Sequence, residues 1–145
     1  MYYALPSALE LLNNPLSRSK LKILSPFDNL LIQRKRTQTL FDFDYQLECY
    51  LPESKRKFGY FSLPILWDGN LIARMDCKAD RKESVLHVHS LVLESSLRKT
   101  DAFARALSKE LVSFLQFNEC NSLQIHITSP AKFKPELKKE IKKLM

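Results

Sequence analysis

The dipeptide Asp68-Gly69 constrains the fold most strongly, because it stands between two apolar runs, residues 60–67 and 71–77. Asp-Gly readily adopts the positive φ angles that a two-residue hairpin turn requires. Apolar and polar residues alternate through the second run, which is the period of a half-buried strand. The sequence therefore predicts an antiparallel hairpin within a larger sheet.

A helix start precedes this hairpin. Ser25 is a suitable N-cap, Pro26 suits the first helical position, and Asp28 occupies the reciprocal capping place three residues on. A single helix is therefore predicted over residues 29–41. The residues expected to reach the core from this helix are Leu30, Leu31 and Leu40.

Strand and helix periods recur along the rest of the chain. Further strands are predicted at residues 21–24, 45–51, 85–93 and 123–127, and helices at 6–10, at 100–117 and from Pro135 onward. The predicted fold class is α+β, with a barrel-like antiparallel sheet of four to five strands and flanking helices.

Charge and cysteine content indicate the partner and the compartment. Lys and Arg number 23 against 16 Asp and Glu, a net charge of +7, which favours a polyanion although small proteins are often basic. The widely spaced Cys49, Cys77 and Cys120 form no CxxC pair and indicate reduced thiols. The sequence shows no apolar run of membrane-spanning length and no signal pattern, so we expect a cytoplasmic protein without a membrane partner.

Three basic clusters are candidate DNA contacts. They are Arg34, Lys35 and Arg36 in the predicted helix, Lys55, Arg56 and Lys57 in a loop, and Lys78, Arg81 and Lys82 at a strand end. Arginine binds phosphate through its planar fork, and the aromatic residues that follow the loop cluster suit base stacking. Each cluster can also be a solvated helix face or a charged sheet edge. Their shared position near loop ends favours DNA binding.

Two histidines raise the question of a metal site. His87 and His89 share one face of a predicted strand, and Cys77 can lie on a neighbouring strand. The spacing supplies no fourth ligand, so we expect ordinary sheet histidines, no bound metal and no cofactor.

The carboxylates have structural explanations. Asp28 is explained by capping, and Asp76 by pairing with Arg74 or Lys78, two residues away on the same strand face. The sequence contains no Ser-His-Asp order, P-loop or GxGxxG motif. No catalytic residue is therefore assigned.

Several segments, in unbroken order, are similar to one protein family. They are SPFDNLLIQRKR (25–36), FDYQLECYLP (43–52), KRKFGYFSLPILW (55–67) and LIARMDCKADR (71–81), preceded by YYALPSALE (2–10). Over residues 2–94 the chain resembles the YcaQ-type winged-helix DNA glycosylases, bacterial enzymes that excise alkylated bases and unhook interstrand crosslinks.

The resemblance implies a DNA-repair function with double-stranded DNA as the partner. Family members have tandem winged-helix units followed by a small β-barrel, and a Gln-containing catalytic motif in their N-terminal part. By this resemblance, residues 1–20 are the remnant of a winged-helix unit with a linker, and residues 21–145 are a β-barrel-like DNA-binding domain. Gln33 and Gln38 belong to the later segment and receive no catalytic role.

We therefore expect the chain to bind DNA without excising bases, with the absent winged-helix domains as partners. Two other interpretations stay open. The chain can be a self-sufficient N-glycosidic hydrolase that uses Asp76 or Asp80, or a non-enzymatic interaction domain.

Overall fold

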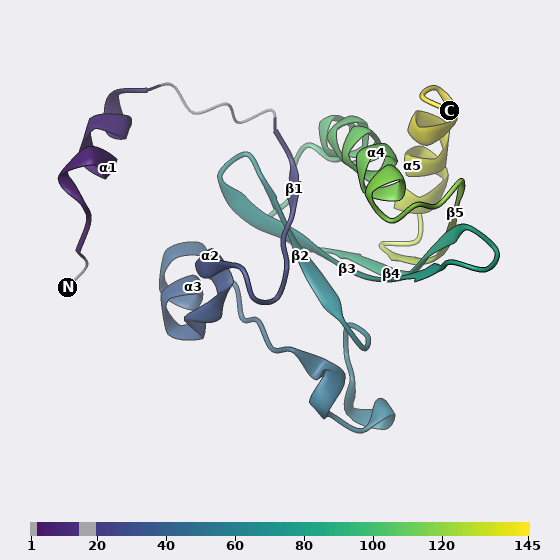
Figure 1. Ribbon diagram of the computed structural model, residues 1–145, viewed down its shortest axis with the longest axis horizontal. Coiled ribbons are helices and arrows are strands. Elements are labelled where there is room, and N and C mark those ends of the chain that lie inside the picture. Colours follow the sequence, from purple (N-terminus) through teal and green to yellow (C-terminus); the bar gives the residue numbers. More distant parts are fainter. Residues whose placement is uncertain (1–2, 15–19) are drawn as a thin grey trace.

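The computed structural model describes residues 3–14 and 20–145 (Figure 1). The first of these segments forms α1 (Pro6–Glu10) and the 3-10 turn η1 (Leu11–Asn13), which confirms the helical turn predicted at 6–10. Neither element contains a buried residue. The linker predicted to end at residue 20 lies largely outside the described residues.

A five-stranded sheet forms the centre of the structure, with its strands in sequence order. The strands are β1 (Lys22–Ile23), β2 (Ser62–Trp67), β3 (Asn70–Asp80), β4 (Val85–Leu93) and β5 (Ser122–Ser129). The predicted hairpin is confirmed: Trp67 pairs with Asn70, and Asp68 and Gly69 have φ angles of 51° and 77°. These positive angles are those of a two-residue turn whose twist matches the flanking strands.

The predicted α+β class is confirmed, with five strands, mostly antiparallel, and flanking helices, but the sheet differs from the expected antiparallel barrel in two respects. The sheet is open, with β1 and β5 at opposite edges, and β4 pairs with β5 in parallel. A parallel pair requires a crossover connection, which here is α4 (Thr100–Phe117). Because α4 covers one face of the sheet, the core is closed by helices rather than by pairing of the two edge strands.

The inner face of the sheet is the face covered by α4 and by α5 (Phe133–Lys142), as Figure 1 shows. The helix predicted at 100–117 is confirmed. The terminal helix begins two residues before Pro135, because an early helical position needs no intrahelical N–H bond. The buried residues of α4 and α5 that pack against the sheet include Phe103, Leu107, Leu111, Phe133, Leu137 and Ile141.

The helix predicted over residues 29–41 is two helices, α2 (Asn29–Ile32) and α3 (Arg34–Phe41), separated at Gln33. Asp28, rather than Ser25, is the N-cap, and its carboxylate accepts a 2.8 Å hydrogen bond from the Leu30 N–H. The break changes which face meets the core. Leu31 is fully buried, Leu30 is half-buried, and Leu40 is exposed, contrary to expectation.

The docked segment, residues 42–61, lies on the outer face of the sheet, opposite α4 and α5. It contains the 3-10 turns η2 (Glu48–Tyr50) and η3 (Glu53–Lys55), so the strand predicted at 45–51 is wrong. Burial does not alternate over 45–51: Tyr45 and Glu48, three residues apart, are the buried side chains. Burial raises the pKa of Tyr45 to about 12, and its hydroxyl donates to the Ser62 carbonyl at 2.7 Å.

Arg74, a buried side chain of β3, binds the docked segment. Arg74 lies between the rings of Phe43 and Phe58, with its guanidinium carbon 4.0 and 4.2 Å from the ring centroids. It also donates to the Asp44 carbonyl at 2.7 Å and pairs with Glu94 at 2.6 Å. The expected pairing of Arg74 with Asp76 is therefore replaced by pairing with Glu94.

Two buried carboxylates accept backbone hydrogen bonds from the same segment. Asp76 accepts from the N–H groups of Tyr60 and Phe61 at 3.1 and 3.0 Å. Glu48, only 4% exposed, accepts from those of Phe58 and Gly59 at 2.7 and 3.2 Å. A buried charge is tolerated only when its hydrogen bonds are satisfied, so these bonds fix the path of residues 58–61.

Gly59 is required where the docked segment meets Asp76. Its φ angle is +118°, and a Cβ atom added there would lie 2.2 Å from Asp76 Oδ2. We expect Gly59→Ala to lower the free energy of unfolding by about 3 kcal/mol, through overpacking and a strained φ angle.

Gly69→Ala is the matched control, because Gly69 also has positive φ but no atom lies within 4 Å of an added Cβ. Its expected loss is about 1 kcal/mol. Urea unfolding of both variants measures the difference, and equal losses would show that the close approach to Asp76 does not matter.

Candidate nucleic-acid interface

The outer-face cleft is a cavity of about 570 Å³ between the docked segment and strands β3 and β4. Its lining residues are Glu53, Arg56, Tyr60, Phe61, Asp76, Cys77, Lys78 and His89. The hydrogen bonds of Asp76 to the backbone of residues 60 and 61 set the position of one wall relative to β3. The cleft therefore has a fixed shape.

One residue from each of two predicted basic clusters, Arg56 and Lys78, lines this cleft. Arg56 lies on the docked segment, where its Nε donates to the Leu51 carbonyl at 3.0 Å and its guanidinium carbon lies 4.9 Å from the Tyr60 ring centroid. Lys78 is exposed on β3 and lines the same cleft. Lys55 and Lys57 flank Arg56 and are both exposed. Their ammonium groups can therefore contact phosphates.

The cluster of residues 34–36 is not at this cleft. α3 begins next to the small core that Leu31 forms with Leu71, near the β2–β3 turn. Arg81 and Lys82 lie in the β3–β4 turn, at the far end of β3 (Figure 1). The structure thus separates the first cluster from the third.

The arginines of the first cluster make intramolecular contacts. Arg34 donates to the Leu31 carbonyl at 2.6 Å and to the Pro26 carbonyl at 3.4 Å, and its guanidinium carbon lies 4.4 Å from the Tyr45 ring centroid. Arg36 donates to the Asn29 carbonyl. Lys35, between them, is exposed. The break at Gln33 directs both guanidinium groups to carbonyls, which the prediction of an unbroken helix did not anticipate.

A histidine cluster, in which His87, His89 and His126 form a triangle, lies on the outer face beside the cleft. Ring centroids are 5.2 to 5.9 Å apart, and His87 Nδ1 lies 3.0 Å from His126 Nε2. Desolvation and the charges of His87, His89 and Lys134 lower the pKa of His126. Within the described part of the chain, no group of three His, Cys, Asp or Glu residues is arranged to hold a metal ion.

Sequence reasoning found His87 and His89 but missed His126. The parallel pairing of β4 with β5 brings His126 beside them, and this pairing connects residues 39 positions apart. A local signal was present, because His126 stands between Ile125 and Ile127 in an alternating run. The polar position of that run marks the outer face.

The cysteines carry no reactive thiolate at the cleft. Cys49, Cys77 and Cys120 are free. Burial, and secondarily the Asp76 carboxylate, raises the pKa of Cys77 to about 12. The thiol is protonated at neutral pH and packs against the inner core, so it is neither a nucleophile nor an anion at the cleft.

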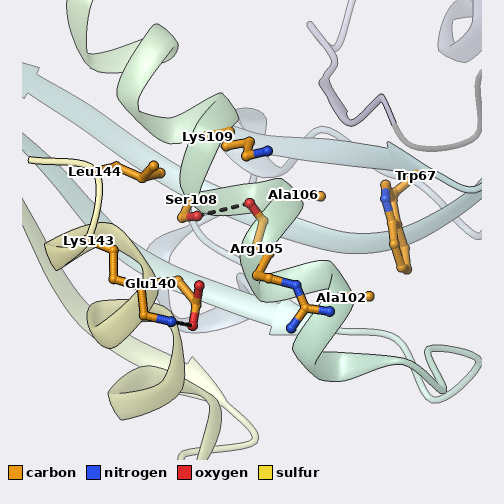
Figure 2. Close-up of a pocket in the computed structure, with 9 residues that line it drawn as sticks. All are labelled: Trp67, Ala102, Arg105, Ala106, Ser108, Lys109, Glu140, Lys143 and Leu144. Carbon is orange, nitrogen blue, oxygen red and sulfur yellow. Dashed lines mark hydrogen bonds and ion pairs between the residues drawn. The ribbon is translucent and has the colours of Figure 1, made fainter.

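A second hollow, of about 350 Å³, lies between α4 and α5 on the opposite side of the molecule (Figure 2). Arg105 and Lys109 line it from α4, and Glu140 and Lys143 form a 2.6 Å ion pair on α5. Desolvation and a hydrogen bond with Asp101 raise the pKa of the nearby Glu136 carboxyl. Among the residues that the structure describes, Arg105 and Lys109 are the cations of this hollow that form no ion pair, so it is the rival site for a polyanion.

A protein-family model, described as DNA glycosylase AlkZ-like, matches residues 1–117 of this chain. The chain belongs to the AlkZ-like DNA glycosylase family. This membership confirms the resemblance found in the sequence and indicates a role in DNA repair with DNA as the substrate. No solved structure matches the chain.

The family match covers the outer-face cleft and ends with α4. Thus β5 and α5, with His126, lie outside the matched residues. In the described ranges of this AlkZ-like chain, no helix is long and apolar enough to cross a membrane.

The contacts of Arg34 predict a stability effect. Arg34→Ala should lower the free energy of unfolding by about 1 to 2 kcal/mol, because hydrogen bonds from a charged donor to two carbonyls are lost. Lys35→Ala should change it by less than about 0.5 kcal/mol, since that side chain is exposed. Thermal or urea unfolding distinguishes the two, and a neutral Arg34→Ala would mean that its guanidinium is available for DNA.

Proposed function

We propose that residues 21–145 are a DNA-binding domain of an AlkZ-like glycosylase, and that they contact the phosphates of double-stranded DNA without reading its sequence. The observation that carries this proposal is the convergence of Arg56 and Lys78 on one cleft, flanked by Lys55 and Lys57. Phosphate contacts of this kind position a protein on a duplex.

The proposed contacts fall into two groups. The central group is Arg56 and Lys78, which line the outer-face cleft, with Lys55 and Lys57, which flank Arg56 in the sequence and line a neighbouring hollow beside Arg74. Lys35 and Arg81 are exposed at separate places and extend the contact along the DNA. The remaining members of the first cluster, Arg34 and Arg36, act chiefly by holding α2 and α3 together.

The residues that precede the domain support a second part of the proposal, that family winged-helix units pack against residues 1–20. Leu5, Leu9, Leu11 and Leu12 are between 55% and 78% exposed. An exposed group of large apolar side chains favours contact with another protein surface.

We further propose that this chain alone does not excise bases. Asp76 accepts two backbone hydrogen bonds, and Asp80 Oδ1 accepts from the N–H groups of Lys82 and Glu83 at 3.0 and 3.2 Å. Both carboxylates therefore have a structural role as acceptors of backbone hydrogen bonds, which differs from the role of a catalytic base. Excision also requires a site that holds a flipped base and positions water at the sugar.

The alternative, a self-sufficient N-glycosidic hydrolase, is favoured by one observation. The raised pKa of Glu136, beside Asp101, is a feature of catalytic carboxyl groups. An excision assay therefore needs variants of Asp76 and of Glu136.

Salt dependence tests the DNA-binding proposal. We expect log Kd for a short duplex to change with log salt with a slope of magnitude about 3 to 5, because each phosphate contact releases counterions. Lys55→Ala with Lys57→Ala should reduce this magnitude by about 2. Fluorescence anisotropy at several salt concentrations measures the slope.

Lys138→Ala with Lys139→Ala is the matched control, because both lysines are exposed on α5, away from the cleft. This pair should leave the slope nearly unchanged. If it reduces the slope and the 55/57 pair does not, the DNA site is on α5 and the proposed interface is wrong.

Excision is tested with duplex DNA that contains N7-alkylguanine. We expect no release of free base above the uncatalysed background. Release that Asp76→Asn or Glu136→Gln abolishes would instead establish the hydrolase alternative and name its carboxylate.

A further inference from the structure

We propose that the outer-face cleft binds one unpaired nucleobase of a DNA strand, by stacking it on Tyr60. This inference rests on the proposed DNA-binding function and adds a preference for DNA that contains an unpaired base. Tyr60 is 56% exposed although it lies at the cleft wall, and Arg56 covers part of its ring. An exposed ring beside a guanidinium is the arrangement that stacks bases in single-strand-binding proteins.

The chemistry of the cleft suits a flat aromatic ligand with a phosphate attached. Tyr60 supplies an exposed aromatic ring, and Phe61 and Cys77, which pack mainly against the inner core, also line the cleft. Arg56 and Lys78 supply two positive charges. Of the two carboxylates that line the same cleft, Glu53 and Asp76, the second accepts hydrogen bonds from the backbone of residues 60 and 61. A volume of about 570 Å³ is within the range of ligand sites, roughly 300–1,000 Å³. A nucleotide can enter such a cleft, whereas a stacked base pair within a duplex cannot.

The aromatic surface continues beyond the cleft. His89 lines the cleft and belongs to the histidine cluster, in which the planes of His87 and His89 differ by 10° and those of His89 and His126 by 21°. Lys134 lies beside the cluster, where its ammonium donates to the His126 carbonyl at 2.7 Å. Bases next to the bound one can therefore meet exposed imidazoles and a cation.

The position of Tyr60 is fixed independently of its ring. Its backbone N–H donates to Asp76, and Gly59 before it lies against the same carboxylate. Because the backbone is held without help from the phenol, the ring can be removed without displacing the docked segment. This makes Tyr60→Ala an informative variant.

The test compares two duplexes of one sequence, one fully paired and one with a single unpaired adenine. Wild-type protein should bind the second at least about five-fold more tightly, as expected from one base–aromatic stack. Tyr60→Ala should reduce this ratio to about one, and Tyr60→Phe should keep it, since stacking needs the ring and not the hydroxyl. Tyr50→Ala is the control, because Tyr50 is 84% exposed on the docked segment but does not line the cleft.

A second measurement uses 2-aminopurine at the unpaired position. Its fluorescence should be quenched on binding of the wild type and of Tyr60→Phe, but not of Tyr60→Ala. Free deoxyadenosine monophosphate should not displace the DNA at concentrations at which the DNA with the unpaired base saturates the protein, because the free nucleotide lacks the flanking phosphates. Competition at such concentrations would overturn the assignment to a DNA strand.

The outcomes separate the two proposals. Equal wild-type affinity for both duplexes overturns the base-stacking site and leaves the DNA-binding function standing. A preference that survives Tyr60→Ala also overturns it. Absence of binding to either duplex overturns the DNA-binding function and the stacking site together.

Discussion

The structure depends on three charged side chains buried between the outer face of the sheet and the docked segment. They are Arg74 and Asp76 of β3 and Glu48 of the docked segment, which are 4% to 8% exposed, and each makes hydrogen bonds to the backbone of the docked segment. A segment of twenty residues without a strand can cover a sheet only if its backbone polar groups find partners there. These side chains provide the partners, and removing any one would leave another group buried and unsatisfied.

The same interactions connect the fold to the candidate site. Asp76 holds the backbone of Tyr60 and Phe61 to β3, and Lys78 follows on the same strand face. The Arg56 guanidinium then lies near the Tyr60 ring in a fixed arrangement. A flexible loop with the same composition would have to be ordered on binding, at a cost in affinity. The buried charges thus preorganise an exposed basic and aromatic surface.

Local signals in the sequence predicted the parts of the fold that depend on local physics. The Asp68-Gly69 turn, the strand at 85–93 and the helix at 100–117 are set by turn chemistry and apolar period, and all three are confirmed. The predictions failed where contacts between residues far apart in the sequence determine the local structure. The apolar alternation at 45–51 predicts a strand, but residues 48–50 form a 3-10 turn. Glu48 is buried there and accepts hydrogen bonds from the N–H groups of Phe58 and Gly59, which are 10 and 11 residues away in the sequence and outside any local period.

The candidate site was predictable in part for the same reason. The aromatic and basic composition of residues 55–60 identified the cleft wall, but its partner Lys78 was placed there only by the docking of that segment on β3. Arg34 and Lys35 look equivalent in the sequence, yet a helix break commits Arg34 to two carbonyls and leaves Lys35 exposed. Family membership supports DNA as the partner without locating the contact.

The most direct test of this account is to map the amides whose NMR signals move when the chain is titrated with DNA. We expect shifts at residues 55–60, at Lys78 and at His89, with little change in α4 and α5. Shifts confined to α4 and α5, around Arg105 and Lys109, would contradict this expectation and move the interface to the opposite face of the sheet.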